Sequence, residues 1–209
     1  MIDRRHDALL VIDVQPDFMP GGALPVEDGD LVVAPIAGLM PRFDIVVATQ
    51  DWHPADHASF ASQQGKAPFS TMELHGVTQV LWPDHCVQGS AGAELHRGLP
   101  REPLAMILRK GMHREVDSYS GFKENVGPGG SRPTTGLGAW LRARGVERVF
   151  VCGLARDYCV RFTAEDAAGE GFSTCVVDDL TRSVVPGSKP EVDAALAAHG
   201  VSLVRSSEL

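Results

Sequence analysis

Six short apolar runs, separated by stretches that can form helices, restrict the folds open to this chain. The runs cover residues 8–14, 44–49, 104–108, 149–152, 172–178 and 201–204. The first run is almost continuously apolar, which is typical of a parallel strand covered on both faces. Helices are expected over residues 31–40, 137–145, 160–168 and 190–199. This alternation predicts a three-layer α/β/α sandwich around a mostly parallel six-stranded sheet, in a single domain of residues 1–209.

Charge and hydropathy exclude several classes of partner. The net charge is −8, which argues against nucleic acid or an anionic membrane surface as the main partner and suits a small-molecule substrate. No run approaches the ~18 apolar residues of a membrane span, and the first apolar run is too short for a secretory signal. The four cysteines form no Cys-x-x-Cys pair. We therefore expect a cytoplasmic protein with free thiols.

Polar side chains follow four successive apolar runs at the points where these runs end. Asp13 ends the first run, Asp51 and His53 follow the second, Lys110 follows the third, and Cys159 follows the fourth. In parallel α/β sheets, ligands bind beyond the carboxyl ends of the strands. We therefore expect these groups to lie together at one edge of the sheet.

Cys159 follows a strand and precedes a helix, so its thiol is expected near a helix N-terminus. The peptide dipoles there favour an anion and are expected to lower the thiol pKa, which would make Cys159 a nucleophile. Lys110 would stabilise the thiolate and Asp13 would accept its proton. Taken singly, each residue has another explanation: a turn residue for Asp13, a solvated charge for Lys110 and a buried thiol for Cys159.

A second group of side chains has the chemistry of a metal site. Asp51 and His53 are two residues apart in an extended segment, so both side chains point the same way. The third ligand would come from the long irregular stretch of residues 50–92, with His57 and His85 as candidates. Two histidines and a carboxylate suit zinc, iron or manganese. The alternative is that these histidines bond the backbone of their own loops.

Three aromatic residues, Phe18, Trp82 and Tyr119, lie in predicted loops near the same edge. They could stack against a planar ring, or they could anchor the long loops. The phosphate-binding motifs Gly-x-x-x-x-Gly-Lys-Ser/Thr and Gly-x-Gly-x-x-Gly are absent, as is the Gly-x-Ser-x-Gly elbow of serine hydrolases. Nucleotide binding through those loops is therefore not expected.

The motifs resemble those of nicotinamidases, a group within the isochorismatase-like cysteine hydrolases. The resemblance covers residues 11–18, 21–24, 50–60, 82–87, 110–111, 117–122 and 153–160, in order along the chain. Two of these segments, Asp51-Trp52-His53 and Trp82-Pro83-Asp84-His85-Cys86, are specific to nicotinamidases within the superfamily.

The resemblance implies the Rossmann-like isochorismatase fold and the hydrolysis of nicotinamide to nicotinate and ammonia, a step of NAD salvage. Pyrazinamide would also be accepted. Cys159 would attack the carboxamide carbon and form a thioester, Asp13 would act as general base, and Lys110 would hold both in place. The N–H groups of Ala155 and Cys159 would form the oxyanion hole. In the family the peptide bond equivalent to Leu154–Ala155 is cis.

The resemblance also implies one divalent metal, zinc first with iron or manganese as alternatives, that binds the pyridine nitrogen of the substrate. Its ligands would be Asp51, His53 and His85, with His57 as a further candidate. The substrate ring would contact Phe18, Trp82, Tyr119 and Leu154. Family members include monomers and homodimers, so the oligomeric state stays open.

One residue departs from the family pattern, because Arg156 stands where relatives often carry Thr or Ser. We expect its side chain to point outward. Two other functions remain as alternatives: a hydrolase of another amide or carbamoyl compound in the same superfamily, and a non-catalytic binding protein of the same fold. The first alternative generally lacks the metal motif, and the second would lack the thiol, lysine or carboxylate.

Overall fold

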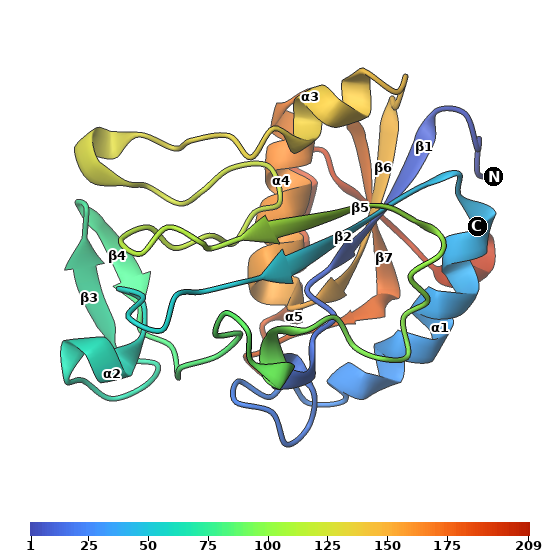
Figure 1. Ribbon diagram of the computed structural model, residues 1–209. Coiled ribbons are helices and arrows are strands. Elements are labelled where there is room, and N and C mark those ends of the chain that lie inside the picture. The colour runs from blue at the N-terminus through green and yellow to red at the C-terminus, as the bar shows by residue number, and fades with distance from the viewer.

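The central element is a six-stranded sheet whose paired strands are all parallel, seen in a computed structural model that describes residues 1–209 (Figure 1). Its strand order is β5-β2-β1-β6-β7-β8. The strands are β1 (Asp7–Ile12), β2 (Ile45–Asp51), β5 (Leu104–Lys110), β6 (Arg148–Leu154), β7 (Ser173–Arg182) and β8 (Ser202–Val204). The predicted six-stranded parallel sheet is therefore confirmed.

Helices cover both faces of the sheet and complete the predicted three layers (Figure 1). On one face α1 (Val33–Leu39) packs in a core cluster with β1, β2 and β6. The other face carries α3 (Leu137–Arg142), α4 (Arg161–Gly169) and α5 (Lys189–Ala198) in a second cluster. All six residues of β1 are buried, because β1 has a strand on each side and a helical layer on each face. This double cover explains its continuous apolar run.

A two-stranded antiparallel hairpin was not predicted from the sequence. It consists of β3 (Thr71–Leu74) and β4 (Val77–Val80), and the short helix α2 (Ala61–Gln64) precedes it. Residues 50–92 have no regular apolar pattern and were expected to be irregular. These elements are only four residues long and are exposed or half-buried at most positions, so they show little of the apolar periodicity on which such predictions depend. The hairpin lies beyond the carboxyl ends of β2 and β5 (Figure 1).

The order of the strands reverses between β1 and β6, which are neighbours in the sheet but far apart in sequence. Chain connections leave this point in opposite directions, and ligands of open α/β sheets bind in the resulting crevice. Asp13 directly follows β1, and Cys159 lies five residues after β6. The fold therefore places both groups at the expected binding edge. None of the helices is long and apolar enough to cross a membrane.

Gly153 in β6 is required by the close approach of β1. Its φ is +108°, and a Cβ atom there would lie 2.1 Å from the carbonyl oxygen of Ile12.

We expect Gly153→Ala to lower the free energy of unfolding by about 2 kcal/mol or more beyond the loss in Gly171→Ala. Gly171 is the matched control, because it has a φ of +91° but no atom within 4 Å of such a Cβ. Urea unfolding followed by circular dichroism measures both, and equal losses would contradict the expectation.

Candidate active site

Lys110, at the end of β5, is the centre of the site. Its Nζ lies 2.9 Å from Asp13 Oδ2, donates a hydrogen bond to Asp51, and lies 3.5 Å from the Cys159 sulfur. It also donates to the backbone oxygen of Ser118 at 2.9 Å. The Lys110 side chain is fully buried. The structure thus brings together Lys110 and three of the other groups that were expected at this edge of the sheet.

The charged groups of this cluster shift one another's pKa values. Burial alone would lower the pKa of Lys110, but the carboxylates of Asp13 and Asp51 raise it well above the ordinary value, so the ammonium is permanent. Burial opposes ionisation of Asp51, yet Lys110 and His53 hold its pKa well below the usual range. For Asp13, burial wins over the attraction of Lys110 and raises the pKa. Asp13 is therefore the more basic of the two carboxylates.

The Cys159 thiol lies in a wide π-helical turn, Arg156–Val160, that leads into α4. Its position before a helix was predicted, but the expected lowering of its pKa is wrong. Burial raises the pKa of the thiol well above the ordinary value, and the nearby Lys110 only partly offsets this. The resting group is a neutral thiol, so a base must remove its proton when it attacks. An oxygen of Asp13 lies within 4.8 Å of the sulfur.

Thr49 in β2 orients the candidate base. Its hydroxyl donates to Asp13 Oδ1 at 2.6 Å and accepts from the backbone N–H of Asp13 at 3.1 Å. Asp13 has a φ of +45°, a left-handed conformation that is uncommon for a residue with a side chain. The two bonds to Thr49 hold the carboxylate in this conformation, with its other oxygen toward Lys110. Thr49 was not predicted from the sequence, although it lies in the same strand as Asp51.

The predicted metal ligands also converge. One oxygen of Asp51 and one ring nitrogen each of His53 and His85 lie within 4.8 Å of one another. The Nδ1 of His53 bonds the backbone oxygen of Gly111 at 2.9 Å, and the Nδ1 of His85 bonds that of Pro83 at 2.8 Å. Donation to these oxygens leaves both Nε2 atoms as acceptors. This donor set, with second bonds that fix each ring, fits a transition metal.

His85 is ready to bind a metal in its neutral form. Burial lowers the pKa of its ring to about 4, so the ring is uncharged at neutral pH. His53 differs, because Asp51 raises its pKa in spite of burial. Gly111 has a φ of +66°, and a Cβ atom there would lie 2.4 Å from the His53 ring. The Lys110-Gly111 pair therefore needs its glycine to make room for His53.

His57, the further candidate ligand, is fully buried beside His53 with ring centroids 4.4 Å apart. Its Nδ1 bonds the Ser59 hydroxyl at 2.8 Å, and its Nε2 bonds the backbone oxygen of Val116 at 3.2 Å. Both ring nitrogens are thus engaged within the protein. His57 does form a second close group with His53 and Asp117, but its own bonds favour a supporting role.

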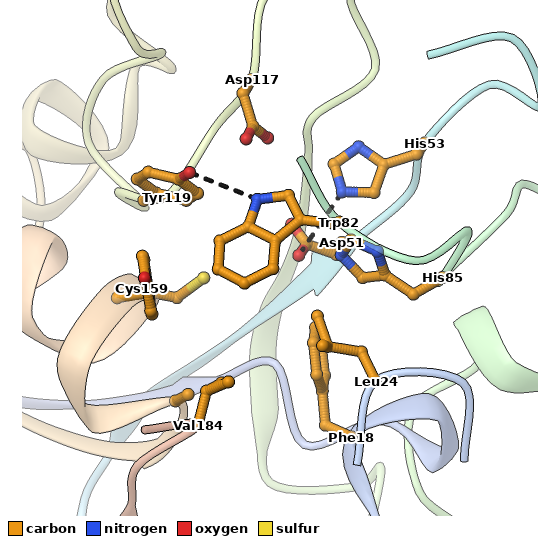
Figure 2. A pocket seen from close by; sticks show the side chains of 12 residues that line it. Phe18, Leu24, Asp51, His53, Trp82, His85, Asp117, Tyr119, Cys159 and Val184 are labelled. Atoms are coloured by element: carbon orange, nitrogen blue, oxygen red, sulfur yellow. Dashed lines mark hydrogen bonds and ion pairs between the residues drawn. The ribbon is translucent and has the colours of Figure 1, made fainter. Parts of the chain in front are cut away.

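A small pocket joins the thiol to the candidate metal ligands (Figure 2). Its lining residues are Phe18, Leu24, Asp51, His53, Trp82, His85, Asp117, Tyr119, Ala155, Tyr158, Cys159 and Val184. About 20 Å³ of it is open to the centre of a water-sized sphere. The aromatic side chains therefore enclose a narrow space beside the thiol.

The three aromatic residues predicted to contact a ring all line this pocket. Phe18 lies edge-on to His85 at 5.6 Å between centroids, and Trp82 lies edge-on to Tyr119 at 6.2 Å. Leu154 differs from expectation, because its fully buried side chain belongs to the core and does not line the pocket. Ala155 after it does line the pocket, and the peptide bond between the two is cis.

Arg156 does not point outward, so that expectation was wrong. Its side chain is only 3% exposed and turns away from the pocket. The guanidinium bonds the hydroxyl of Thr181 and forms ion pairs with Asp178 and Asp193. These partners lie in β7 and α5, far along the chain, so the local sequence gave no sign of them.

The sequence profile of the isochorismatase domain matches residues 7–206. The chain belongs to the isochorismatase family. Among its relatives is the nicotinamidase of Escherichia coli, which is 46% identical over 202 residues and covers 94% of this chain and 93% of that protein. The predicted family and the predicted class of enzyme, a hydrolase, are therefore confirmed.

Solved structures of isochorismatase-family proteins agree with this fold. The nicotinamidase/pyrazinamidase of Acinetobacter baumanii superimposes with a TM-score of 0.92 at 42% identity, over 98% of each chain. The pyrazinamidase of Pyrococcus horikoshii, solved in complex with zinc, superimposes with a TM-score of 0.77 at 35% identity, over 96% of this chain and 99% of that one.

Removal of the Lys110 ammonium should destabilise this fold. We expect Lys110→Met to lower the free energy of unfolding by about 3–5 kcal/mol, because it leaves two buried carboxylates without a counter-ion. Lys189→Met is the control: Lys189 also pairs with two aspartates but is 51% exposed, so about 1 kcal/mol or less should be lost. Urea unfolding measures both. Adding Asp13→Asn to Lys110→Met should restore part of the loss, and no restoration would contradict this explanation.

Proposed function

We propose that this enzyme hydrolyses nicotinamide to nicotinate and ammonia, accepts pyrazinamide as well, and thereby serves NAD salvage. One observation carries the proposal: the Cys159 thiol and the Asp51-His53-His85 donor set face the same aromatic-walled pocket. A flat heteroaromatic amide has a carbonyl carbon for the thiol and a ring nitrogen for a metal. The similarity to nicotinamidases over nearly the whole chain supports the same conclusion.

Asp13 is the general base of the proposed reaction. Its raised pKa makes it a better proton acceptor than an ordinary carboxylate. It takes the proton of the Cys159 thiol as the sulfur attacks the carboxamide carbon. Lys110, 2.9 Å from Asp13 and 3.5 Å from the sulfur, stabilises the thiolate as it forms.

The attack produces a tetrahedral oxyanion, which the backbone N–H groups of Ala155 and Cys159 are proposed to bind. When it collapses, the C–N bond breaks and the proton held by Asp13 passes to the leaving nitrogen, so ammonia departs. A thioester to Cys159 remains. Asp13 then removes a proton from a water molecule that attacks this thioester, and nicotinate leaves with the regenerated thiol.

Asp51, His53 and His85 are the proposed metal ligands, with zinc as the first candidate. A bound divalent ion supplies a Lewis acid for the pyridine nitrogen of the substrate. The ligand side chains do the orienting, because the backbone oxygens of Gly111 and Pro83 hold Nδ1 of each imidazole ring and leave Nε2 as the nitrogen for the metal. The Nε2 of His53 lies 3.6 Å from Asp51 Oδ2, its fellow ligand. Phe18, Trp82 and Tyr119 bind the faces and edges of the ring. The ring is thereby fixed while the reaction occurs at the amide.

The first test is the release of ammonia from nicotinamide by the zinc-loaded protein. Cys159→Ala should lower kcat by roughly 10³-fold or more, since it removes the nucleophile. Cys175→Ala is the control, because Cys175 is also a mostly buried cysteine of this sheet but lies in β7, away from the pocket. It should retain wild-type kcat. A wild-type protein that acts on a carbamoyl compound but not on nicotinamide would refute the proposal.

The metal site has its own test. His85→Ala should lower zinc affinity by roughly 100-fold, since loss of a ligand is at least as harmful as loss of an outer-shell partner. His113→Ala is the control, because His113 is exposed and belongs to none of the three groups of possible ligands. Competition with a chromophoric chelator measures affinity without reference to activity. If His85→Ala binds zinc as the wild type does, the proposed ligand set is wrong.

A further inference from the structure

One buried polar side chain beside the pocket has no part in the proposed reaction. Gln79 lies in β4 of the hairpin and is 4% exposed. It is the only buried residue of β3 and β4, whose other residues are exposed or half-buried. A hairpin of this kind would normally be anchored by an apolar side chain. Here the anchor is an amide that points toward the wall of the pocket.

The Gln79 amide contacts two pocket residues. Its Nε2 donates to Asp117 Oδ2 and to the backbone oxygen of Val80, each at 2.7 Å, and lies 3.1 Å from the Tyr119 hydroxyl oxygen. The same hydroxyl accepts from the indole N–H of Trp82 at 3.3 Å, a bond visible in Figure 2. The positions of the amide nitrogen and oxygen follow from these contacts, because a flipped amide would place its oxygen against the carboxylate of Asp117.

The bonds of Gln79 flank the segment that holds the catalytic cation. Ser118, between Asp117 and Tyr119, accepts the hydrogen bond from Lys110 through its backbone oxygen. Three consecutive residues thus connect the hairpin, the lysine and the ring wall. A shift of this segment would move the Tyr119 ring in the pocket.

We propose that Gln79 is a positioning residue that orders the Trp82–Tyr119 wall and so sets affinity for the aromatic ring of the substrate. It touches neither the amide nor the metal-ligating nitrogens, so its effect falls on binding rather than on the reaction at the thiol. The inference rests on the proposed function for the identity of the ring. The order of the wall itself does not depend on that identity.

The central test replaces the donor by an acceptor of the same shape. Gln79→Glu sets a carboxylate against Asp117, and we expect the KM for nicotinamide to rise roughly tenfold, as for the loss of a hydrogen bond to a charged group. The kcat should change much less. Hydrogen exchange of residues 117–122, followed by mass spectrometry, should become faster. Thr78→Ala, an exposed neighbour in the same strand, should leave KM, kcat and exchange unchanged.

A reciprocal exchange distinguishes positioning from general damage. In Gln79→Glu with Asp117→Asn, the new amide donates to the new carboxylate, so the pair is restored with its direction reversed. We expect the KM of the double variant to fall below that of Gln79→Glu alone. If Gln79→Glu does not fold, Gln79→Met removes the donors without adding charge and should still raise KM and speed exchange.

Three results would overturn the inference. They are wild-type KM and exchange in Gln79→Glu, a loss confined to kcat, and a double variant whose KM is no lower than that of Gln79→Glu. Failure of the proposed function would look different. In that case the wild-type protein would release no ammonia from nicotinamide, and the exchange of residues 117–122 would still decide whether Gln79 orders the wall.

Discussion

The buried ammonium of Lys110 is the interaction on which the rest of the site depends. Two carboxylates and a thiol surround this fully buried group. Without a cation, neither Asp13 nor Asp51 could stay ionised at such burial. In the proposed reaction the same charge serves two purposes: it keeps one carboxylate available as a base and the other as a metal ligand. Asp51 therefore joins the proposed nucleophile to the proposed metal ligands through a single side chain.

The sheet topology explains why so much of the site could be predicted. Asp13, Asp51, Lys110 and Cys159 lie at or just after the ends of four neighbouring strands, and strand ends are visible in the sequence as the limits of apolar runs. Parallel pairing then places these ends at one edge. The family resemblance suggested what each of these residues does. The geometry explains how they can act together in one site.

Other features depend on contacts between distant segments, so local sequence could not reveal them. Arg156 is buried because Asp178 and Asp193 come from β7 and α5. The pKa of Cys159 rises because burial outweighs both its place before a helix and the lysine beside it. The hairpin escaped detection because its one buried residue, Gln79, is polar. In each case contacts between distant segments decide the structure, and the local sequence alone suggests a different one.

The narrow space between the aromatic walls has a consequence for the choice of substrate. The centre of a water-sized sphere can reach only about 20 Å³ of this space. An amide on a tetrahedral carbon, as in protein side chains, carries substituents above and below its plane, whereas the atoms of a heteroaromatic carboxamide lie nearly in one plane. A flat ring can also stack against the aromatic side chains. The pocket thus favours thin substrates over the bulkier amides of proteins and free amino acids.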